Sequence, residues 1–276
     1  MACSATREHR KSDHDSIEQS LPKPEWQSGH CDWRGQRNGP SDCFSSRRRG
    51  SKRRVVDLDQ AKVDAVVQSI QNEYGAQRAI GFAIDVRHTE QLQTVVDKTI
   101  SAFGCLDIVI NNAGISLSSP ANSSNDDFLS AWDTTLAINL SAYVHLVRAA
   151  LPHLKQSSSG RIVNVASTES IVATPTLSAY SASKSGVTGL TRSLAVELGK
   201  DGITVNCICP GPINTGMTEA IPSDMKSKYA QRHVALRRYG EPEEVAHMTV
   251  SLCMPAMSFV TGASIVVDGG MTIRHT

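Results

Sequence analysis

The sequence predicts an α/β fold of the Rossmann type, a doubly wound parallel sheet crossed by helices. The first observation is that, from Val55 onward, short β-branched runs alternate with stretches of helical periodicity. The second is that polar residues and glycines follow several of these runs. Ligands of such sheets bind beyond the carboxyl ends of the strands, so the chemistry of this chain is expected there.

The expected elements follow one another in a regular order. Strands are expected at 55–56, 80–84, 106–110, 161–165, 203–208 and 264–267. Helices are expected near 60–74, 88–103, 126–151, 178–199 and 242–253. The last helix begins at Pro242, because proline lacks only an N–H that the first turn leaves unpaired, and Glu243 and Glu244 favour the positive end of the helix dipole.

Composition and charge narrow the class of protein. The 276 residues are 40% hydrophobic and 20% charged, which suits one sizeable core with an appendage. Residues 1–54 hold 12 of the 28 Lys and Arg, so the remainder is mildly acidic and gives no electrostatic case for nucleic acid or an anionic membrane. No apolar run approaches the roughly 18 residues that span a bilayer, and the polar N-terminus has no signal-peptide apolar region. We therefore expect a cytoplasmic protein.

The cysteines favour the same compartment. The chain has seven, without the pairing typical of a metal site or a disulfide scaffold. Cys207 and Cys209 alternate within an apolar run, so we expect buried thiols rather than a redox pair.

Carboxylates follow the first two predicted strands. Asp57 could accept hydrogen bonds from the hydroxyls of an adenosine ribose and would repel a 2′-phosphate, but it could equally cap the next helix. Asp85 and Val86 follow the second strand. The third strand is followed by Asn112-Ala113-Gly114, whose small residues would let the backbone approach a ligand, although such a turn alone is more often structural.

Tyr180 and Lys184 form the most informative pair in the sequence. Their i, i+4 spacing places both on one face of a helix. A free phenol titrates near 10, so it exchanges protons poorly at neutral pH unless a nearby ammonium favours its charged form. Ser167, thirteen residues earlier, follows the strand at 161–165 and could hold a carbonyl or alcohol oxygen beside the phenol. The spacing alone is common, but its combination with the turns at 111–114 and 210–211 is not.

The chain from 55 to 276 resembles the short-chain dehydrogenase/reductase family, and within it the 3-oxoacyl-acyl-carrier-protein reductases. The matching residues are Asn111 to Gly114, Asn139, Ser167, Tyr180 with Lys184, Pro210 to Thr215, and Asp268 to Gly270.

This resemblance implies a role for each matching residue. Tyr180 would be the proton donor or acceptor, and Lys184 would lower its pKa and hold the nicotinamide ribose. Ser167 would position the substrate oxygen, and Asn139 would anchor a proton-relay water. The expected contacts to the cofactor, NAD rather than NADP, are Asp57, Asp85, Val86, Asn112, Ala113, Gly114, Tyr180, Lys184, Pro210, Gly211, Ile213 and Thr215.

One element of the family is missing: the first strand with its TGxxxGxG turn, whose backbone N–H groups receive the pyrophosphate at a helix N-terminus. Residues 26–54 instead show no apolar periodicity and end with six basic residues in eight. Taken literally, this is a disordered basic arm for nucleic acid or nuclear import.

The genetic code favours another interpretation. A shift of one base permits residues 26–43 to be read as GKVVIVTGGARGMGQAIA, which contains the missing strand and turn. The glycines derived from the codons of Trp26 and Trp33 are nearly forced, because Trp has one codon. Residues 44–54 permit LxLAxxGAKVV, which meets Val55 in register. We therefore interpret 26–54 as an out-of-frame remnant, 1–25 as unassigned and 55–276 as the catalytic domain.

The resulting hypothesis is an NAD-dependent oxidoreductase that interconverts a secondary alcohol and a ketone, as 3-oxoacyl reductases do. A sugar or steroid dehydrogenase of the same family is the alternative within the enzyme class. A different class is also open, since a chain without its phosphate loop could be an inactive homologue that acts only as a partner subunit. The resemblance further implies a homotetramer and a substrate-dependent lid near 217–238, so the substrate stays open.

Overall fold

The computed structural model describes residues 52–275, and the expectations for 1–25 and for 26–51 lie outside this part. Its strands are β1 (Arg53–Asp57), β2 (Ala79–Ala83), β3 (Ile108–Asn111), β4 (Arg161–Val165), β5 (Thr204–Pro210) and β6 (Ser264–Val267). All pair in parallel, with Val55 opposite Gly81 and Ile162 opposite Val205. Each expected strand is present, with its ends moved by two residues or fewer.

The helices are α1 (Gln60–Tyr74), α2 (Thr89–Phe103), α3 (Asn125–Leu136), α4 (Ala142–Leu154), α5 (Ser178–Leu198), α6 (Ser223–His233) and α7 (Pro242–Cys253). The single helix expected at 126–151 is two helices joined by a π-helical segment, Ala137–Ser141. Helix α6 lies in the segment expected to form the lid.

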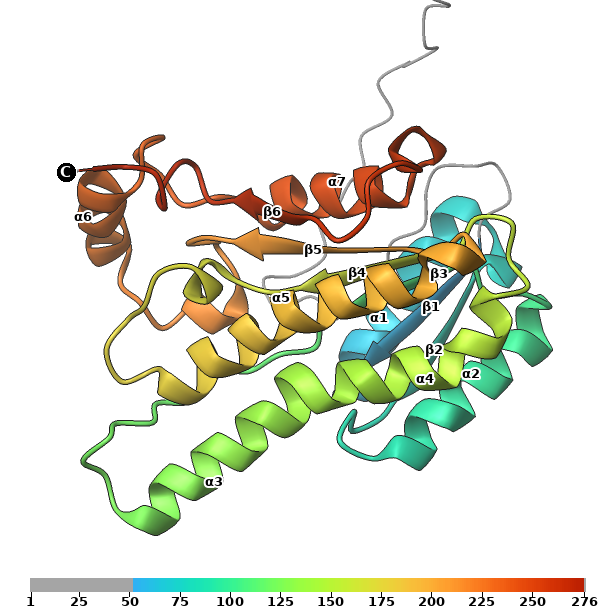
Figure 1. Cartoon of the computed structure of the whole chain (residues 1–276), viewed down its shortest axis with the longest axis horizontal. Helices are drawn as coiled ribbons and strands as arrows, with labels where there is room; N and C mark the ends of the chain where they lie inside the picture. Colours follow the sequence, from blue (N-terminus) through green and yellow to red (C-terminus); the bar gives the residue numbers. More distant parts are fainter. Residues whose placement is uncertain (1–51, 276) are drawn as a thin grey trace, which may run out of the picture. The chain divides into compact units, whose positions relative to one another are not determined.

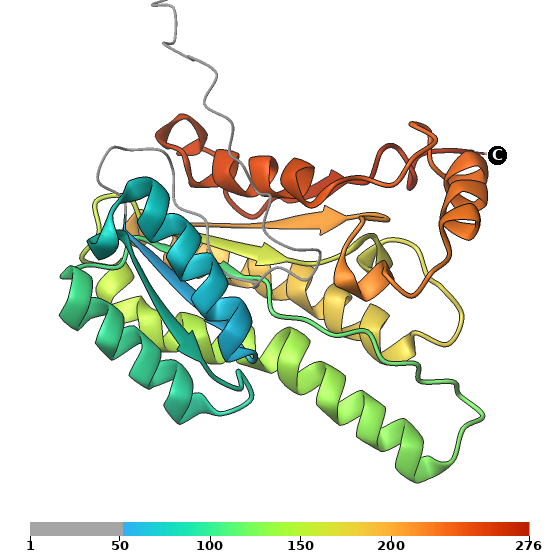
Figure 2. The ribbon, with the colours of Figure 1, turned by 180° about the vertical axis from the view of Figure 1, so that it is seen from behind.

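Helices cover both faces of the larger group of strands (Figures 1 and 2). Ile162 of β4 packs in a cluster with Leu146 of α4, whereas its neighbour Val163 packs with Leu252 of α7. Successive residues of a strand point to opposite faces, so this alternation shows that the sheet is doubly wound. The predicted fold class is confirmed.

The strands divide into two groups within residues 52–275. Strand β1 pairs with β2, while β3, β4, β5 and β6 form a second sheet in that order. The doubly wound order 3-2-1-4-5-6 would place one strand between those occupying the positions of β1 and β3. The pairing of the described strands therefore agrees with this order if the first strand of the sheet lies outside residues 52–275.

The start of α1 decides between two interpretations of Asp57. The side chain that caps α1 is that of Asp59, which accepts hydrogen bonds from the backbone N–H groups of Ala61 and Lys62. Asp57 ends β1, and its Oδ1 accepts from the backbone N–H of Asp59 at 3.0 Å. The capping alternative for Asp57 was therefore wrong, because the residue two positions later takes that place.

Candidate active site

A large cleft lies at the carboxyl ends of the strands and brings together Ser167, Tyr180 and Lys184. Its volume is about 1410 Å³, more than a drug-sized ligand requires. Ser167 follows β4, and Tyr180 lies in the first turn of α5 with Lys184 one turn later. The cleft is thus lined by residues that follow the buried strand β4 and by residues at the start of the long helix α5.

Ser167 and Tyr180 contact each other directly. Ser167 is buried, and a hydrogen bond between its side chain and Tyr180 favours the charged form of the phenol. The Oγ of Ser167 also accepts from the backbone N–H of Glu169 at 3.2 Å. This second bond fixes the hydroxyl at the mouth of the cleft, where a substrate oxygen could meet both groups.

Lys184 is a buried cation beneath the phenol. Its Nζ donates to the backbone carbonyl of Val165 at 2.8 Å and lies 5.8 Å from the centre of the Tyr180 ring. Burial lowers the pKa of Lys184 to about 8. An ammonium has three donors, so beyond the bond to Val165 it can offer donors to a ligand in the cleft.

The pKa of Tyr180 is displaced opposite to the expectation drawn from the family. Burial raises this pKa most, and the charge of Glu169 raises it further, while the bond with Ser167 lowers it. These effects of the described residues keep the phenol of Tyr180 neutral. In that form it can donate a proton to a ligand.

Glu169 is a residue that the sequence did not single out. Its Oε2 accepts from the Ser181 hydroxyl at 2.7 Å and from the backbone N–H of Thr174, and its Oε1 accepts from the Thr174 hydroxyl at 2.6 Å. The carboxylate therefore ties the loop after Ser167 to the residue that follows Tyr180. In the sequence, only its position two residues after Ser167 could have indicated that Glu169 lies near the cleft.

Asn139 lies within the π-helical segment and is fully buried. Its amide donates to the backbone carbonyl of Ile115 at 2.9 Å and to the Ser183 hydroxyl at 3.1 Å, and its Oδ1 accepts from the N–H of Ile115. The side chain of Asn139 therefore connects the segment that follows β3 to helix α5. Any contact to a relay water would therefore involve the backbone of this segment, where the i→i+5 pattern interrupts the regular ladder.

The expected cofactor residues divide into two sets. Those that line the cleft are Asp57, Asn112, Gly114, Pro210, Gly211, Ile213 and Thr215. Two of the others, Val86 and Ala113, line a separate small pocket between β1 and β3, and Asp85 lines neither pocket. Asp85 instead accepts from the guanidinium of Arg87 at 2.9 Å, which lowers the pKa of its carboxyl.

One glycine at the cleft is required by a close approach. A Cβ on Gly211 would lie 2.6 Å from the Cβ of Asp268 and 2.8 Å from its Cα, closer than side chains allow. A Cβ on Gly114 would meet Nζ of Lys184 at 3.4 Å and Oδ1 of Asn139 at 3.5 Å, which are ordinary van der Waals contacts. The turn at Gly211 is therefore packed tightly against Asp268.

The sequence model of a family described as Enoyl-(Acyl carrier protein) reductase matches residues 45–272. The chain belongs to the short-chain dehydrogenase/reductase family. A 3-oxoacyl-[acyl-carrier-protein] reductase, FabG, of Thermotoga maritima is 32% identical over 217 residues, 79% of this chain and 86% of the relative. A D-threitol dehydrogenase of Mycolicibacterium smegmatis is 34% identical over 82% of this chain and 85% of the relative. A 3-alpha-(or 20-beta)-hydroxysteroid dehydrogenase of Mycobacterium tuberculosis is 38% identical over 68% of each chain.

Solved structures of short-chain dehydrogenase/reductase enzymes show the same fold. A putative gluconate dehydrogenase from Agrobacterium tumefaciens aligns with a TM-score of 0.74 at 28% identity, covering 80% of this chain and 86% of that one. A gluconate 5-dehydrogenase from Burkholderia cenocepacia, in complex with NADP and tartrate, aligns with a TM-score of 0.73 at 26% identity and the same coverage. Among residues 52–275, no helix has the length and apolar character needed to cross a bilayer.

Proposed function

We propose that this protein is an NAD-dependent oxidoreductase that interconverts a secondary alcohol and a ketone, with a 3-oxoacyl substrate as the leading candidate. The observation that carries the proposal is the meeting of Ser167, Tyr180 and Lys184 in one cleft. A phenol beside a hydroxyl can hold one oxygen atom of the substrate from two sides. A proton can then pass between Tyr180 and that oxygen.

The residues present fit the nicotinamide half of a dinucleotide. Lys184 is buried, is charged below a pKa of about 8, and has donors beyond its bond to Val165 that suit the hydroxyls of a ribose. Thr215 and Ile213 line the same cleft. The donors for the pyrophosphate are expected in the glycine-rich turn that the shifted reading of residues 26–43 permits, which lies outside the described residues.

The chain's own residues would move the proton. The bound nicotinamide would supply or accept a hydride at the carbonyl carbon. Tyr180, held neutral by burial, would donate its proton to the oxygen of a ketone, and Ser167 would fix that oxygen. Lys184 would stabilise the phenolate that remains, because a positive charge near the ring favours the charged form of the phenol.

Asp57 supports NAD as the cofactor. It stands at the end of β1 and lines the cleft, where a carboxylate can accept hydrogen bonds from ribose hydroxyls and would repel a 2′-phosphate. A gluconate 5-dehydrogenase of the same fold was solved with NADP, so the family includes users of either cofactor. Measuring kcat/KM with both cofactors tests the choice, and a preference for NADP would refute it.

The substrate class rests on the relatives and on the segment around α6. Similar proteins include an acyl-carrier-protein reductase, a threitol dehydrogenase and a hydroxysteroid dehydrogenase. Met217, Ile221 and Lys226 line the cleft and give it a mixed apolar and polar wall. Turnover of a 3-oxoacyl thioester, a sugar alcohol and a hydroxysteroid should be compared, and the first should be fastest. Faster turnover of either other class would favour the sugar or steroid alternative.

The proposed active protein carries the shifted reading at residues 26–54 and is unchanged from Val55 onward. We call this protein the frame-corrected chain. We call the protein with the printed sequence the written chain. The written chain is the candidate for an inactive partner subunit. Titration of both with NADH separates the two hypotheses, because only a chain with the glycine-rich turn should bind. Both the cytoplasmic location and the homotetramer stay proposals, and sedimentation of the frame-corrected chain as a monomer would refute the assembly.

A further inference from the structure

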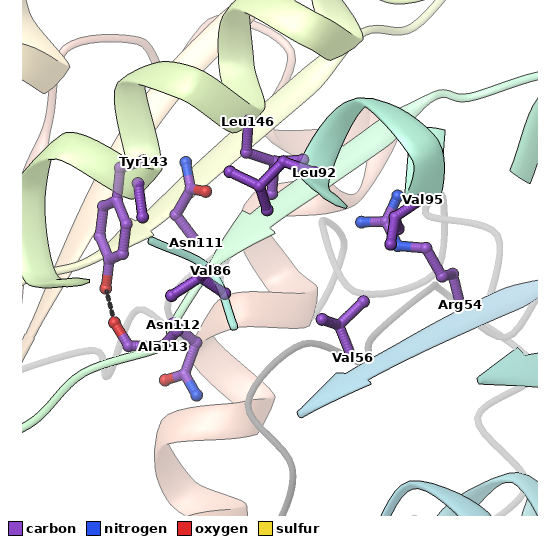
Figure 3. Close-up of a pocket in the computed structure, with 11 residues that line it drawn as sticks. Arg54, Val56, Val86, Leu92, Val95, Asn111, Asn112, Ala113, Tyr143 and Leu146 are labelled. Carbon is purple, nitrogen blue, oxygen red and sulfur yellow. Dashed lines mark hydrogen bonds between the residues drawn. The ribbon is translucent and has the colours of Figure 1, made fainter. Parts of the chain in front are cut away.

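Tyr143 carries a buried phenol that the mechanism above does not use. It lies in α4, one turn after Asn139, and is 1% exposed. Its hydroxyl donates to the backbone carbonyl of Ala113 at 3.0 Å, a bond drawn in Figure 3, and lies 3.3 Å from the carbonyl of Val165. Tyr143 lines the small pocket between β1 and β3 and not the cleft, so it can act on a ligand only through its neighbours.

The two carbonyls near this hydroxyl belong to segments that border the cleft. Ala113 stands in the turn after β3, between Asn112 and Gly114, which both line the cleft. Val165 ends β4, and its carbonyl also accepts the hydrogen bond of Lys184 at 2.8 Å. The hydroxyl of Tyr143 therefore connects the turn after β3 to the carbonyl that anchors the lysine.

The ring of Tyr143 faces the ammonium of the same lysine. Nζ of Lys184 lies 5.7 Å from the centre of the Tyr143 ring and 5.8 Å from that of the Tyr180 ring. An ammonium within about 6 Å of an aromatic face is attracted by the quadrupole of the ring, and the attraction is stronger when the cation is removed from water. Lys184 is only 3% exposed, so the Tyr143 ring offsets part of the cost of burying this cation.

We propose that Tyr143 is a positioning residue for the reaction: its hydroxyl holds the turn at Ala113 in the shape that admits the cofactor, and its ring holds the ammonium of Lys184 in place. This inference rests on the proposed function, because it needs a dinucleotide in the cleft. Phenylalanine would keep the ring and remove the hydroxyl, whereas leucine would remove both. The two parts of the role can therefore be separated by two substitutions.

The pKa of Lys184 reports on the part of the role that belongs to the ring. The titratable groups that face its ammonium are Tyr180 of its own helix, Tyr143 of α4 and Cys209 of β5. Burial lowers the pKa of Lys184 to about 8, and the negative charge that Cys209 can carry opposes this shift. Loss of the Tyr143 ring would disfavour the charged lysine further, so its pKa should fall.

The experiment compares Tyr143→Phe and Tyr143→Leu in the frame-corrected chain. NADH affinity is measured by fluorescence titration, kcat and KM by ketone reduction, and the pKa of Lys184 by NMR of isotope-labelled lysine, assigned with Lys184→Met. Both variants should bind NADH about threefold more weakly or worse, because both lose the bond to Ala113. In Tyr143→Phe the KM for NADH should rise while kcat stays within about twofold. Only Tyr143→Leu should lower the pKa of Lys184, by about 0.5 or more.

Val147→Ala is the matched control for a change in helix packing alone. Val147 lies one turn after Tyr143 in α4, is buried, and packs in the cluster that contains Leu146 and Ile162. Its truncation should lower the stability of the protein but leave NADH affinity and the pKa of Lys184 unchanged. The proposal is overturned if Tyr143→Phe binds NADH as tightly as the unmodified chain, if Tyr143→Leu and Tyr143→Phe give the same pKa of Lys184, or if Val147→Ala reproduces both effects.

The same samples separate this inference from the proposed activity. The expected changes in NADH affinity and in the pKa of Lys184, without ketone reduction by the unmodified frame-corrected chain, would support the positioning role and contradict the proposed reaction. Ketone reduction by the unmodified chain, with NADH affinity and the pKa of Lys184 unchanged in both variants, would support the reaction and overturn the role of Tyr143.

Discussion

The β3–β6 sheet and the β1–β2 pair supply different parts of one cleft, yet they are supported very differently. Strands β4 and β5 each have a neighbour on both edges and helices on both faces. Strand β1 has one described neighbour, and its cluster with α1 contains only four buried residues, Val55, Val63, Ile70 and Ala79. The residues proposed for proton transfer, Ser167, Tyr180 and Lys184, belong to the first region, whereas Asp57, proposed to bind the adenosine ribose, belongs to the second.

The bonds that position the residues proposed for proton transfer do not come from the β1–β2 pair. Ser167, Lys184 and Asn139 are held by bonds to Glu169, Val165, Ile115 and Ser183, and Tyr180 bonds to Ser167, all within the better supported region. The residues proposed for proton transfer are therefore positioned within the described part of the chain, and the interpretation of residues 26–54 as out of frame stays a prediction.

The largest effect is expected from Tyr180→Phe in the frame-corrected chain. The change removes the proton carrier and nearly preserves packing, so turnover should fall by about 10² to 10⁴. NADH affinity should stay within a few fold, because the adenosine half is untouched. Turnover above a tenth of the unmodified rate, under conditions where chemistry limits it, would require another proton donor.

Asp57→Ala makes the complementary change in the β1–β2 region. Loss of the carboxylate removes both the ribose contact and the repulsion of a 2′-phosphate, so the ratio of kcat/KM for NAD over NADP should fall at least tenfold. The pH profile of turnover should not move, because the proton-transfer groups lie on the other region. An unchanged ratio would show that β1 does not reach the adenosine ribose.

Lys184→Met tests the cost of burying a cation in the catalytic region. The folded pKa of about 8 lies below the ordinary 10.5, so the folded state disfavours the charged lysine. The stability of the unmodified protein should rise as pH rises from about 8 to 10.5, as the folded lysine loses its proton first. The Met variant should be more stable below pH 8, on the order of 1–3 kcal/mol, and should lack that rise.

Denaturant unfolding of both proteins across this pH range measures the difference. A Met variant that is less stable at neutral pH would show that the bond from Lys184 to the Val165 carbonyl outweighs the cost of burial.

The smallest effect is expected from Glu169→Gln. The negative charge of Glu169 raises the pKa of Tyr180, so its removal should lower that pKa. The pH limb of turnover assigned to the phenol should move to lower pH by a fraction of a unit. Ser181→Ala is the matched control, since it removes one bond of the same loop and keeps the charge. An equal shift in both variants would assign the effect to loop position rather than to charge.

The fold class and six strands were predicted from the sequence, because strand runs are local patterns. Ser167, Tyr180 and Lys184 line one cleft, and their catalytic roles stay predictions. The sequence did not predict the π-helical segment at Asn139 or the loop contacts of Glu169, since both depend on partners far along the chain or across a loop. The direction of the Tyr180 pKa was also missed, because burial is a property of the assembled cleft. Asp85 bonds to Arg87 and lines neither pocket, so its expected contact to adenine stays a prediction.

NADH binding shows whether the strand and turn encoded by the shifted frame complete this protein. The written and frame-corrected chains, identical from Val55 onward, are titrated with NADH side by side while fluorescence is followed. We expect saturable binding by the frame-corrected chain and none by the written chain, which should also aggregate through its unprotected strand edges. Cooperative folding of the written chain with micromolar affinity for NADH would contradict this expectation.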